Sequence, residues 1–422
     1  MGVPPRRRRL GSGTAVIRLA VPVLLCGSWA AADAESKSPV SIQLWREHFA
    51  GEGAYLADLQ GSYLRASGRK VELYEGEWRE SERKIEDWTQ RLERYAPDLM
   101  VVQDAQLPLV LGSAASLEGR FPPSFLQALW PGALAQGRVQ GVQVALPWRA
   151  HPLALYYNTD LFMAAGASPP ATPEDLLTVA GKLSDPPNVY GLGLPGGTGG
   201  GAADCFMALF RGQGGLLFDD RGRLSLNSDA GLGALQLFSE LTRSRSTQPE
   251  VLTWTSPELA RLFLQGRLAM LIEGPWLLRE ASLTPPPFKP GVAPVPRAKG
   301  GAEHLTADCV FIFDAARDID GCVDFLQYAL GQERQRALSA LGVPSVRRDV
   351  GAALPAGEGW EVFTRALREG RGPSASSWDE IASLLERLIF LTVSGRATPE
   401  AAIDAIDIDL LDEPEHPGPD RP

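Results

Sequence analysis

The sequence predicts an α/β protein of two domains. Its 422 residues exceed the size at which a single hydrophobic core keeps growing, so two domains are the expectation. With 44% apolar and 22% charged residues, the composition is that of an ordinary globular protein. Short apolar runs alternate with helical patterns along most of the chain, which is typical of sheets flanked by helices.

The first 32 residues predict an export signal. Four arginines at positions 6–9 give a cationic start, and the apolar run at 15–25 is too short for a permanent membrane anchor. Cleavage after Ala32 or Ala34 would release a periplasmic protein. Lipid anchoring through Cys26 is the less favoured alternative, because a large leucine precedes this cysteine where a small residue is wanted.

Charge and cysteine content exclude several classes of function. Removing residues 1–32 takes away five arginines and no acid, so the formal charge falls from −10 to −15. A chain this acidic is poorly suited to nucleic acid or an anionic membrane. Cys205, Cys309 and Cys322 remain, an odd number that does not indicate a disulfide framework, and we expect all three to be buried small side chains.

The mature chain opens with a predicted βαβ unit. Residues 40–44 alternate like a strand, 54–65 have helical periodicity, and 70–74 return as a second strand. Trp45 and Glu47 follow the first strand at its carboxyl end, which is the edge of an open sheet where ligands bind. Core packing is the competing interpretation of Trp45.

A third parallel strand follows a charged helix. Residues 79–95 predict the helix, a proline ends it, and the apolar run 99–102 predicts the strand. Gln103 and Asp104 emerge at the polar end of this strand. An aspartate in such a position is also commonly a helix cap or a surface acid.

Two further strands are expected at 141–146 and 153–157, separated by an interruption at 147–152 that is bracketed by prolines. An interruption of this kind suits a crossover between two lobes, and His151 lies within it. Beyond it, a strand at 190–194 leads into a glycine-rich loop and a helix that opens with Asp204. Residues 191–196 match GxGxxG only formally, because the match lies within the strand and Pro195 and more glycines stand where a phosphate-binding helix would begin.

The stretch from 256 to 276 combines a helix, a strand and a polar-aromatic corner. Ser256 is the expected N-cap of the helix, and residues 268–272 predict a buried strand. At its carboxyl end Glu273, Gly274 and Trp276 offer a carboxylate, approachable backbone and a large ring, which suit a ligand site. The alternative for Trp276 is a core aromatic under a turn.

The remaining chain continues the α/β pattern. Residues 305–313 predict another strand, and the proline-rich stretch 284–296 must be extended. The tail at 412–422 is expected to be disordered. Helices are expected at 229–242, 320–330, 332–340, 361–368, 378–393 and 398–411.

Several segments in this order resemble one family, the type 1 extracellular solute-binding proteins of carbohydrate ABC importers, to which maltose-binding protein belongs. The resemblance covers residues 40 to 411. It rests on the order and spacing of many weak motifs, since no single one is decisive. The segments are 96–102, 146–162, 212–219, 224–228, 263–276, 291–296, 324–327 and 343–347.

The resemblance implies a two-lobed periplasmic-binding-protein-like fold of type II, in which each lobe is a mainly parallel sheet flanked by helices. The cleft would close over a carbohydrate by a hinge motion, and the bound sugar would pass to the membrane permease. A monomer without catalytic activity or cofactor is expected. The implied lobes are 40–150 with 302–345 and 151–301 with 346–411, with crossovers near 149–152, 301–309 and 343–347.

The resemblance also implies the site. Carboxylates, amides and Arg347 would hydrogen-bond sugar hydroxyls, and tryptophans would stack on the C–H faces of the ring. Where maltose-binding protein has a tryptophan after its third strand, this chain has Val102, which argues against a long maltodextrin platform. The candidates are Trp45, Glu47, Gln103, Asp104, His151, Asp204, Trp254, Glu273, Gly274, Trp276, Asp308, Arg347 and Trp378.

Other functions fit the sequence less well. A polyamine or a sugar-phosphate is the main alternative ligand, and the acidic candidates argue against phosphate. A secreted glycoside hydrolase would pair Glu273 with Asp308, but no spacing supports that pair. Tyr156 and Tyr157 could hold ferric iron, yet strand alternation places them on opposite faces. No metal or cofactor site is therefore expected.

Overall fold

The computed structural model describes residues 37–45, 51–89, 96–199, 201–219, 223–350, 359–372 and 378–406. The expected export signal, the candidate Glu47 and the tail at 412–422 lie outside these ranges. None of the helices within them has the length and apolar composition needed to cross a bilayer.

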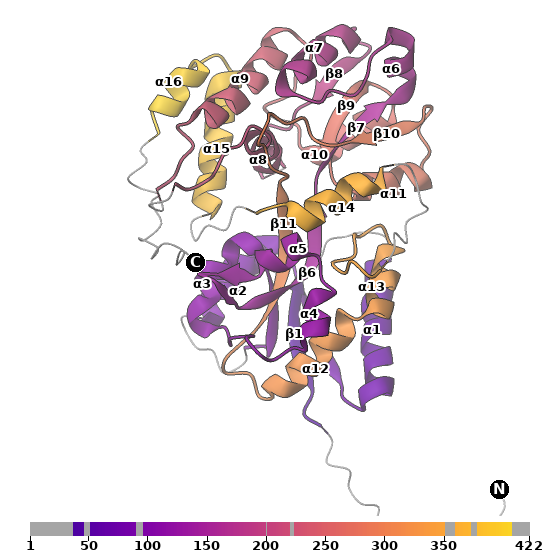
Figure 1. Cartoon of the computed structure of the whole chain (residues 1–422), viewed down its shortest axis with the longest axis vertical. Helices are drawn as coiled ribbons and strands as arrows, with labels where there is room; N and C mark the ends of the chain where they lie inside the picture. Colours follow the sequence, from indigo (N-terminus) through magenta and orange to yellow (C-terminus); the bar gives the residue numbers. More distant parts are fainter. Residues whose placement is uncertain are drawn as a thin grey trace, which may run out of the picture. The chain divides into compact units, whose positions relative to one another are not determined.

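The first sheet has five strands in the order β2-β1-β3-β11-β6. β1 pairs in parallel with β2 and β3, whereas β11 runs antiparallel to both of its neighbours. Four of the five strands therefore share one direction. Figure 1 shows this sheet in the lower half of the view. The strands are β1 Val40–Trp45, β2 Val71–Gly76, β3 Leu99–Gln103, β6 Ala145–Pro152 and β11 Leu305–Ile312.

The second sheet has four strands in the order β10-β7-β9-β8, in the upper half of Figure 1. β8 and β9 are parallel, and β7 is antiparallel to both of its neighbours. A small hairpin, β4 Arg138–Val139 and β5 Val142–Gln143, stands apart from both sheets. The strands of the second sheet are β7 Ala154–Asn158, β8 Tyr190–Gly193, β9 Leu268–Glu273 and β10 Pro290–Ala293.

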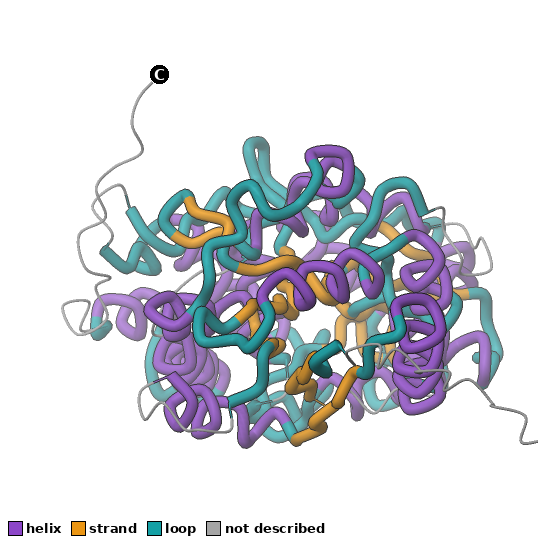
Figure 2. Tube along the Cα trace, turned by 90° about the horizontal axis from the view of Figure 1, so that it is seen from below, coloured by secondary structure: helices purple, strands orange, loops and turns teal. Residues whose placement is uncertain are grey.

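Helices lie on either side of the strands (Figures 1 and 2). Several begin at residues whose side chains accept a backbone N–H, as Thr172 does from Asp175 at the start of α7. The helices are α1 Glu52–Ser67, α2 Ser81–Thr89, α3 Leu107–Val110, α4 Pro123–Gln127, α5 Pro131–Gln136, α6 Thr159–Ala165, α7 Pro173–Leu183, α8 Ala202–Gly212, α9 Asp229–Arg243, α10 Ser256–Leu264, α11 Trp276–Leu283, α12 Ile319–Ala329, α13 Gln332–Ser339, α14 Trp360–Glu369, α15 Trp378–Val393 and α16 Pro399–Asp404, with 3₁₀ turns η1 Trp78–Glu80, η2 Asp104–Gln106 and η3 Leu111–Ser113.

Two local predictions are wrong. Residues 147–152 do not interrupt a strand, because β6 runs unbroken from Ala145 to Pro152 and the break falls at Leu153. Its prolines are tolerated because β6 is an edge strand of the first sheet. The N-cap of α10 is Thr255 rather than Ser256, with Glu258 completing a capping box.

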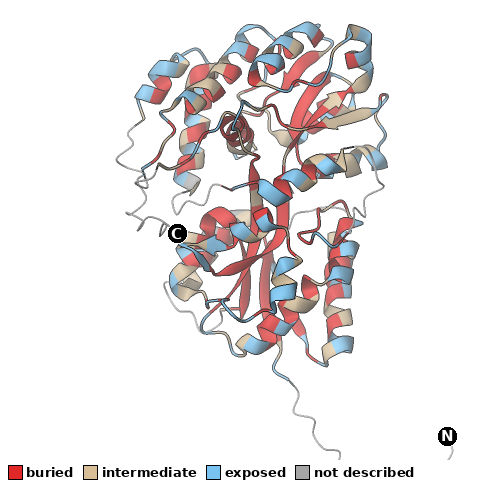
Figure 3. Cartoon of the chain, in the orientation of Figure 1, coloured by how far each residue is buried: buried red, intermediate tan, exposed pale blue. Residues whose placement is uncertain are grey.

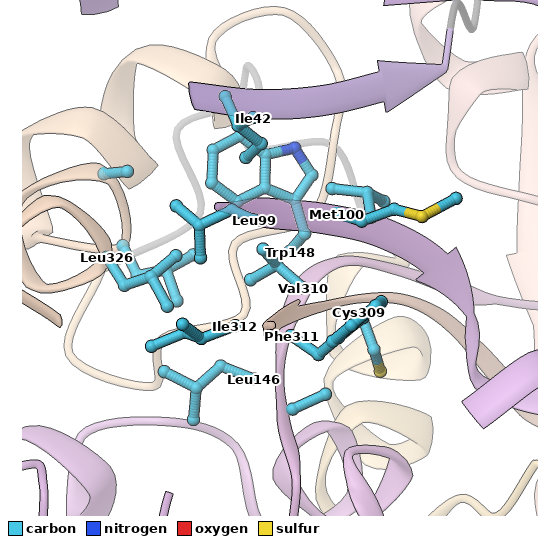
Figure 4. Packing of buried hydrophobic residues seen from close by; sticks show 14 of the residues in the cluster. Ile42, Leu99, Met100, Leu146, Trp148, Cys309, Val310, Phe311, Ile312 and Leu326 are labelled. Atoms are coloured by element: carbon cyan, nitrogen blue, oxygen red, sulfur yellow. The ribbon is translucent and has the colours of Figure 1, made fainter. Parts of the chain in front are cut away.

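The core consists of separate clusters under the two sheets, and most strands are buried (Figure 3). Under the first sheet, Leu99, Val310 and Leu326 pack together (Figure 4). α14 contributes to both sides, because Phe363 packs in a cluster of the second sheet and Leu367 in the cluster of the first. This helix therefore ties the two sheets together.

Other core predictions are confirmed. Cys205, Cys309 and Cys322 are free and buried. Tyr156 and Tyr157 belong to different clusters, as strand alternation requires, and the Tyr156 hydroxyl donates to the Gly274 carbonyl at 2.7 Å. The two phenols therefore do not converge on one site.

Candidate functional site

A row of polar side chains crosses three neighbouring strands of the first sheet. Gln103 on β3 lies opposite Asp308 on β11, and Asp308 lies opposite Arg149 on β6. Residues directly opposite each other in a sheet share a face, so these three side chains lie on the same side. Two residues along β6, His151 lies opposite Thr306 and extends the polar face.

A β-bulge sets the register of this row. The pairing of β11 with β6 shifts after Asp308, so that Cys309 lies opposite Pro147 and Trp148 is the extra residue. Bulges bend a strand and re-aim its side chains, and they are frequent beside functional sites. Here the bulge allows Trp148 to be buried in the core while Arg149 and Asp308 face each other on the polar side.

Asp308 is the centre of a buried charge network. Its Oδ2 lies 3.1 Å from Arg149 Nε and 3.1 Å from His151 Nε2. The other side of the guanidinium reaches Glu52 at the start of α1, with 3.2 Å between Arg149 Nη1 and Glu52 Oε1. Burial alone would raise the pKa of Asp308, but His151 and Arg149 together outweigh burial and hold it below its usual range. Asp308 is therefore an ionised carboxylate at physiological pH.

Asp104 has the opposite electrostatic character. It begins η2 directly after β3 and is only 2% exposed. Its Oδ1 accepts the Ala105 N–H at 2.9 Å, whereas Oδ2 has no hydrogen-bond partner among the described residues and packs against the backbone of Gly372. Burial raises the pKa of Asp104 to about 8, so the carboxyl is mostly protonated at neutral pH.

Glu273, Gly274 and Trp276 form the matching corner of the second sheet. Glu273 ends β9 and is 2% exposed, and burial raises its pKa to about 7 although the Gly274 N–H donates to Oε1 at 3.2 Å. A Cβ at position 274 would clash with the Trp276 ring, so glycine is needed for the ring to fold back over the strand end. Trp276 begins α11 and is 38% exposed.

Residues from both sheets line one small pocket of about 280 Å³. A wider pocket of about 1030 Å³ on the second-sheet side adjoins it, since Leu153, Asp204 and Trp276 line both. The small pocket is lined by Trp78, Gln103, Asp104, Ala105, His151, Leu153, Asp204, Trp276, Thr306, Ala307, Asp308 and Trp378. Glu273, Arg261 and Glu280 are among the residues that line the wider one.

Most of the candidates from the sequence meet here. Glu273 borders the wider pocket, and Gly274 shapes the corner without lining either space. Glu47 lies outside the described residues. The candidates that line the small pocket are Gln103, Asp104, His151, Asp204, Trp276, Asp308 and Trp378.

Three candidates are not brought to either pocket. Trp45 is 1% exposed in the core of the first sheet, where its Nε1–H donates to the Val101 carbonyl at 2.6 Å. Trp254 packs at the border of a second-sheet cluster. The Arg347 guanidinium forms an ion pair with Asp349, with 2.7 Å between Nη2 and Oδ2.

Sequence reasoning missed Trp78 and Thr306. Trp78 lines the small pocket and lies against Trp45, with ring centroids 5.7 Å apart. It could have been found, because it follows the carboxyl end of β2 as the other candidates follow their strands. Within the described part of the chain, no three His, Cys, Asp or Glu side chains are grouped as a metal site would need.

Asp104 leads us to expect protein stability that falls as the pH rises. The folded chain keeps this proton up to about pH 8, whereas the unfolded chain releases it near its ordinary pKa of 3.8. Between these values the unfolded state binds fewer protons, so raising the pH favours unfolding, and the effect is absent at lower pH. In Asp104→Asn the unfolding free energy from urea titrations should depend less steeply on pH. An unchanged pH profile would contradict this assignment.

The family model for bacterial extracellular solute-binding proteins matches residues 65–336. A binding protein of Brucella abortus (strain 2308) is 24% identical over 338 residues, covering 76% of this chain and 82% of the relative. A protein of Deinococcus radiodurans described as an ABC transporter-binding protein is 23% identical over 367 residues, covering 82% and 87%.

Solved structures agree on the fold. The sugar-binding protein MalE of Xanthomonas citri superposes with a TM-score of 0.78 at 19% identity, covering 89% of this chain and 97% of that one. Maltose-bound MalE3 of T. maritima gives 0.73 at 20% identity, covering 87% and 97%. The predicted two-lobed periplasmic-binding-protein fold is thereby confirmed. The family model matches well over half of this chain. The chain therefore belongs to the bacterial extracellular solute-binding protein family.

Proposed function

We propose that this solute-binding protein captures a carbohydrate in the small pocket and delivers it to the membrane permease of an ABC importer. The supporting observation is the mixture of side chains in the pocket lining. Trp78, Trp276 and Trp378 come from three separate elements, and carboxyl, amide and imidazole groups stand between them. Aromatic rings suit the C–H faces of a sugar, and planar polar groups suit its rim of hydroxyls.

The charges of the site favour an uncharged ligand. Among the residues that line the two pockets, five acids face two basic side chains, Arg261 and His151, which disfavours a sugar-phosphate. A polyamine would need several ionised acids. Asp308 is already balanced by Arg149 and His151, whereas Asp104 and Glu273 have pKa values raised to about 8 and about 7. Protonated carboxyls donate hydrogen bonds, which a polyhydroxy ligand can accept.

The division of the site between the two sheets supports closure on binding. Gln103 and Asp308 come from the first sheet, and Trp276 follows the last residue of β9 in the second. A ligand that contacts both sides favours the arrangement in which they are close together, by its differential affinity for that arrangement. The chain carries both halves of the site, so it needs no second copy, and we propose that it acts as an exported monomer.

We propose that the small pocket takes a disaccharide-sized ligand. At about 280 Å³ it lies near the lower end of ordinary ligand sites, which run from roughly 300 to 1,000 Å³. The adjoining wider pocket leaves room for substituents beyond Trp276. A sugar seated in the small pocket would then contact the three tryptophans directly.

A thermal-shift screen followed by titration calorimetry tests this function. Trehalose, sucrose, glucosylglycerol and maltose should include a compound that raises the melting temperature and titrates with a stoichiometry of one, because binding to the folded state alone is stabilising. Spermidine and glucose 6-phosphate represent the alternatives and should have no effect. Stabilisation by spermidine or the phosphate alone would overturn the carbohydrate proposal. Release of reducing sugar on incubation with disaccharides would instead indicate a hydrolase.

A further inference from the structure

Arg149 and Glu52 are charged residues of the first sheet and α1 that line neither pocket. The Arg149 side chain is only 5% exposed and that of Glu52 14%, so both have lost most of their contact with water. A buried ion pair is costly to desolvate and gives little net stability compared with apolar residues. The buried pair of Arg149 and Glu52 is explained if it positions another side chain that does reach the pocket.

His151 is that group. Its side chain is 28% exposed and lines the small pocket, and its Nε2 lies 3.1 Å from the ionised Asp308. An imidazole that donates Nε2–H to a carboxylate is fixed in orientation and in tautomer, so that in its neutral form the proton is on Nε2 and Nδ1 is unprotonated. The orientation of His151 is therefore only as well defined as the position of Asp308.

The position of Asp308 depends in turn on Arg149. The guanidinium donates Nε–H to Asp308, approaches Glu52 through Nη1 and donates from Nη2 to the Trp45 carbonyl at 3.5 Å. It thus joins β11, α1 and β1 to its own strand β6. Lysine has one ammonium in place of this planar fork and could not hold the three acceptors at once.

We propose that Arg149 and Glu52 are positioning residues for ligand binding, which through Asp308 hold the imidazole of His151 in one orientation and one tautomer at the pocket wall. This inference rests on the proposed function in so far as His151 contacts the sugar. Asp104 on η2 and Asp204 on α8 also line the pocket. The Asp104 carboxyl is mostly protonated at neutral pH, because burial raises its pKa to about 8, and Asp204 Oδ1 lies 3.4 Å from Nε2 of another histidine, His304.

The test combines ¹⁵N NMR of histidine-labelled protein with calorimetry. The chain has four histidines, and His151→Gln identifies the relevant signals. In the wild-type protein neutral His151 should be almost entirely the Nε2–H tautomer. In Arg149→Lys both tautomers should appear, and the affinity for whichever of maltose, trehalose and sucrose binds best should fall about tenfold, the loss of roughly one charge-assisted hydrogen bond.

Arg317→Lys is the matched control. Arg317 also holds a buried carboxylate of the first sheet, with 2.7 Å between its Nη2 and Asp98 Oδ2, but Asp98 precedes β3 at the end opposite Gln103. This variant should leave the His151 tautomer and the affinity unchanged. If Arg149→Lys does not fold, Glu52→Gln provides the milder change, because it keeps the Arg149–Asp308 pair.

The outcomes separate this inference from the proposed function. A single His151 tautomer in both Arg149→Lys and Glu52→Gln would overturn the positioning role. An equal loss of affinity in Arg317→Lys would do the same, because it would show a general effect of stability. If none of the three sugars binds the wild-type protein, the carbohydrate proposal fails for these sugars, and the tautomer measurement still decides whether Arg149 positions His151.

Discussion

Replacing Trp276 with alanine is expected to weaken sugar binding severely while the protein keeps its fold. The ring lines both pockets and stands where they join, so a ligand in either space would contact it. Aromatic side chains at the centre of a site typically contribute about 2–4 kcal/mol to binding, which lowers affinity by roughly 30-fold to 1,000-fold when the ring is lost. Trp276 is 38% exposed, so its removal leaves only a shallow defect in packing. Calorimetry with the sugar found in the screen measures the effect.

Trp254→Ala is the control for this experiment. Trp254 precedes α10 in the same half of the molecule and lines neither pocket. The variant should bind sugar like the wild-type protein even though it has also lost an indole. Circular dichroism and the melting temperature establish that both variants are folded. Unchanged affinity in a folded Trp276→Ala protein would refute the proposed site.

The strand ends were predictable because two local signals coincide there. The run 268–272 is apolar and bounded by glycines, so it could be only a short buried strand, and the polar residues behind it had to lie at the sheet edge. The same reasoning placed Gln103 and Asp104 correctly at the end of β3. The end of a predicted strand thus indicates which side chains can reach a ligand.

The direction of individual side chains was not predictable in this way. Trp45 is the last residue of β1 and Trp78 follows the end of β2, but the first ring is buried in the core and the second lines the small pocket. Arg347 is itself a candidate implied by the family resemblance, yet its guanidinium is paired with Asp349. The Arg347 pair is local in the sequence, but the placement of Trp45 and Trp78 depends on neighbours distant in the chain, such as Val101, and a single sequence carries no record of them.

The charge network was missed for the same reason. Arg149 lies in a stretch that appeared to interrupt a strand, because two prolines usually exclude regular pairing. Only the position of β6 at the sheet edge and the bulge at Trp148 make the pairing possible. Neither feature has a signature in the local sequence, so the contacts of Arg149 with Glu52 and Asp308 could not be inferred from it.

Removing the Asp308 side chain should destabilise the protein strongly. Asp308→Ala leaves the buried Arg149 with Glu52 as its remaining carboxylate, and removing one partner of a buried ion pair typically costs about 3–5 kcal/mol. Urea denaturation monitored by tryptophan fluorescence measures this loss. Asp219→Ala is the control, since Asp219 pairs with Arg223 at the surface and such pairs contribute about 1 kcal/mol or less.

The pH dependence of this loss distinguishes an electrostatic effect from a cavity. The pKa of Asp308 is lower in the folded protein than its ordinary value of 3.8, so its ionisation stabilises the fold above that pH. This contribution disappears as the pH falls through the lower folded-state pKa. The difference in unfolding free energy between wild type and Asp308→Ala should therefore narrow in acid, while a cavity would cost the same at every pH. A gap that stays constant from neutral pH into strong acid would show that packing, rather than charge, is what Asp308 contributes.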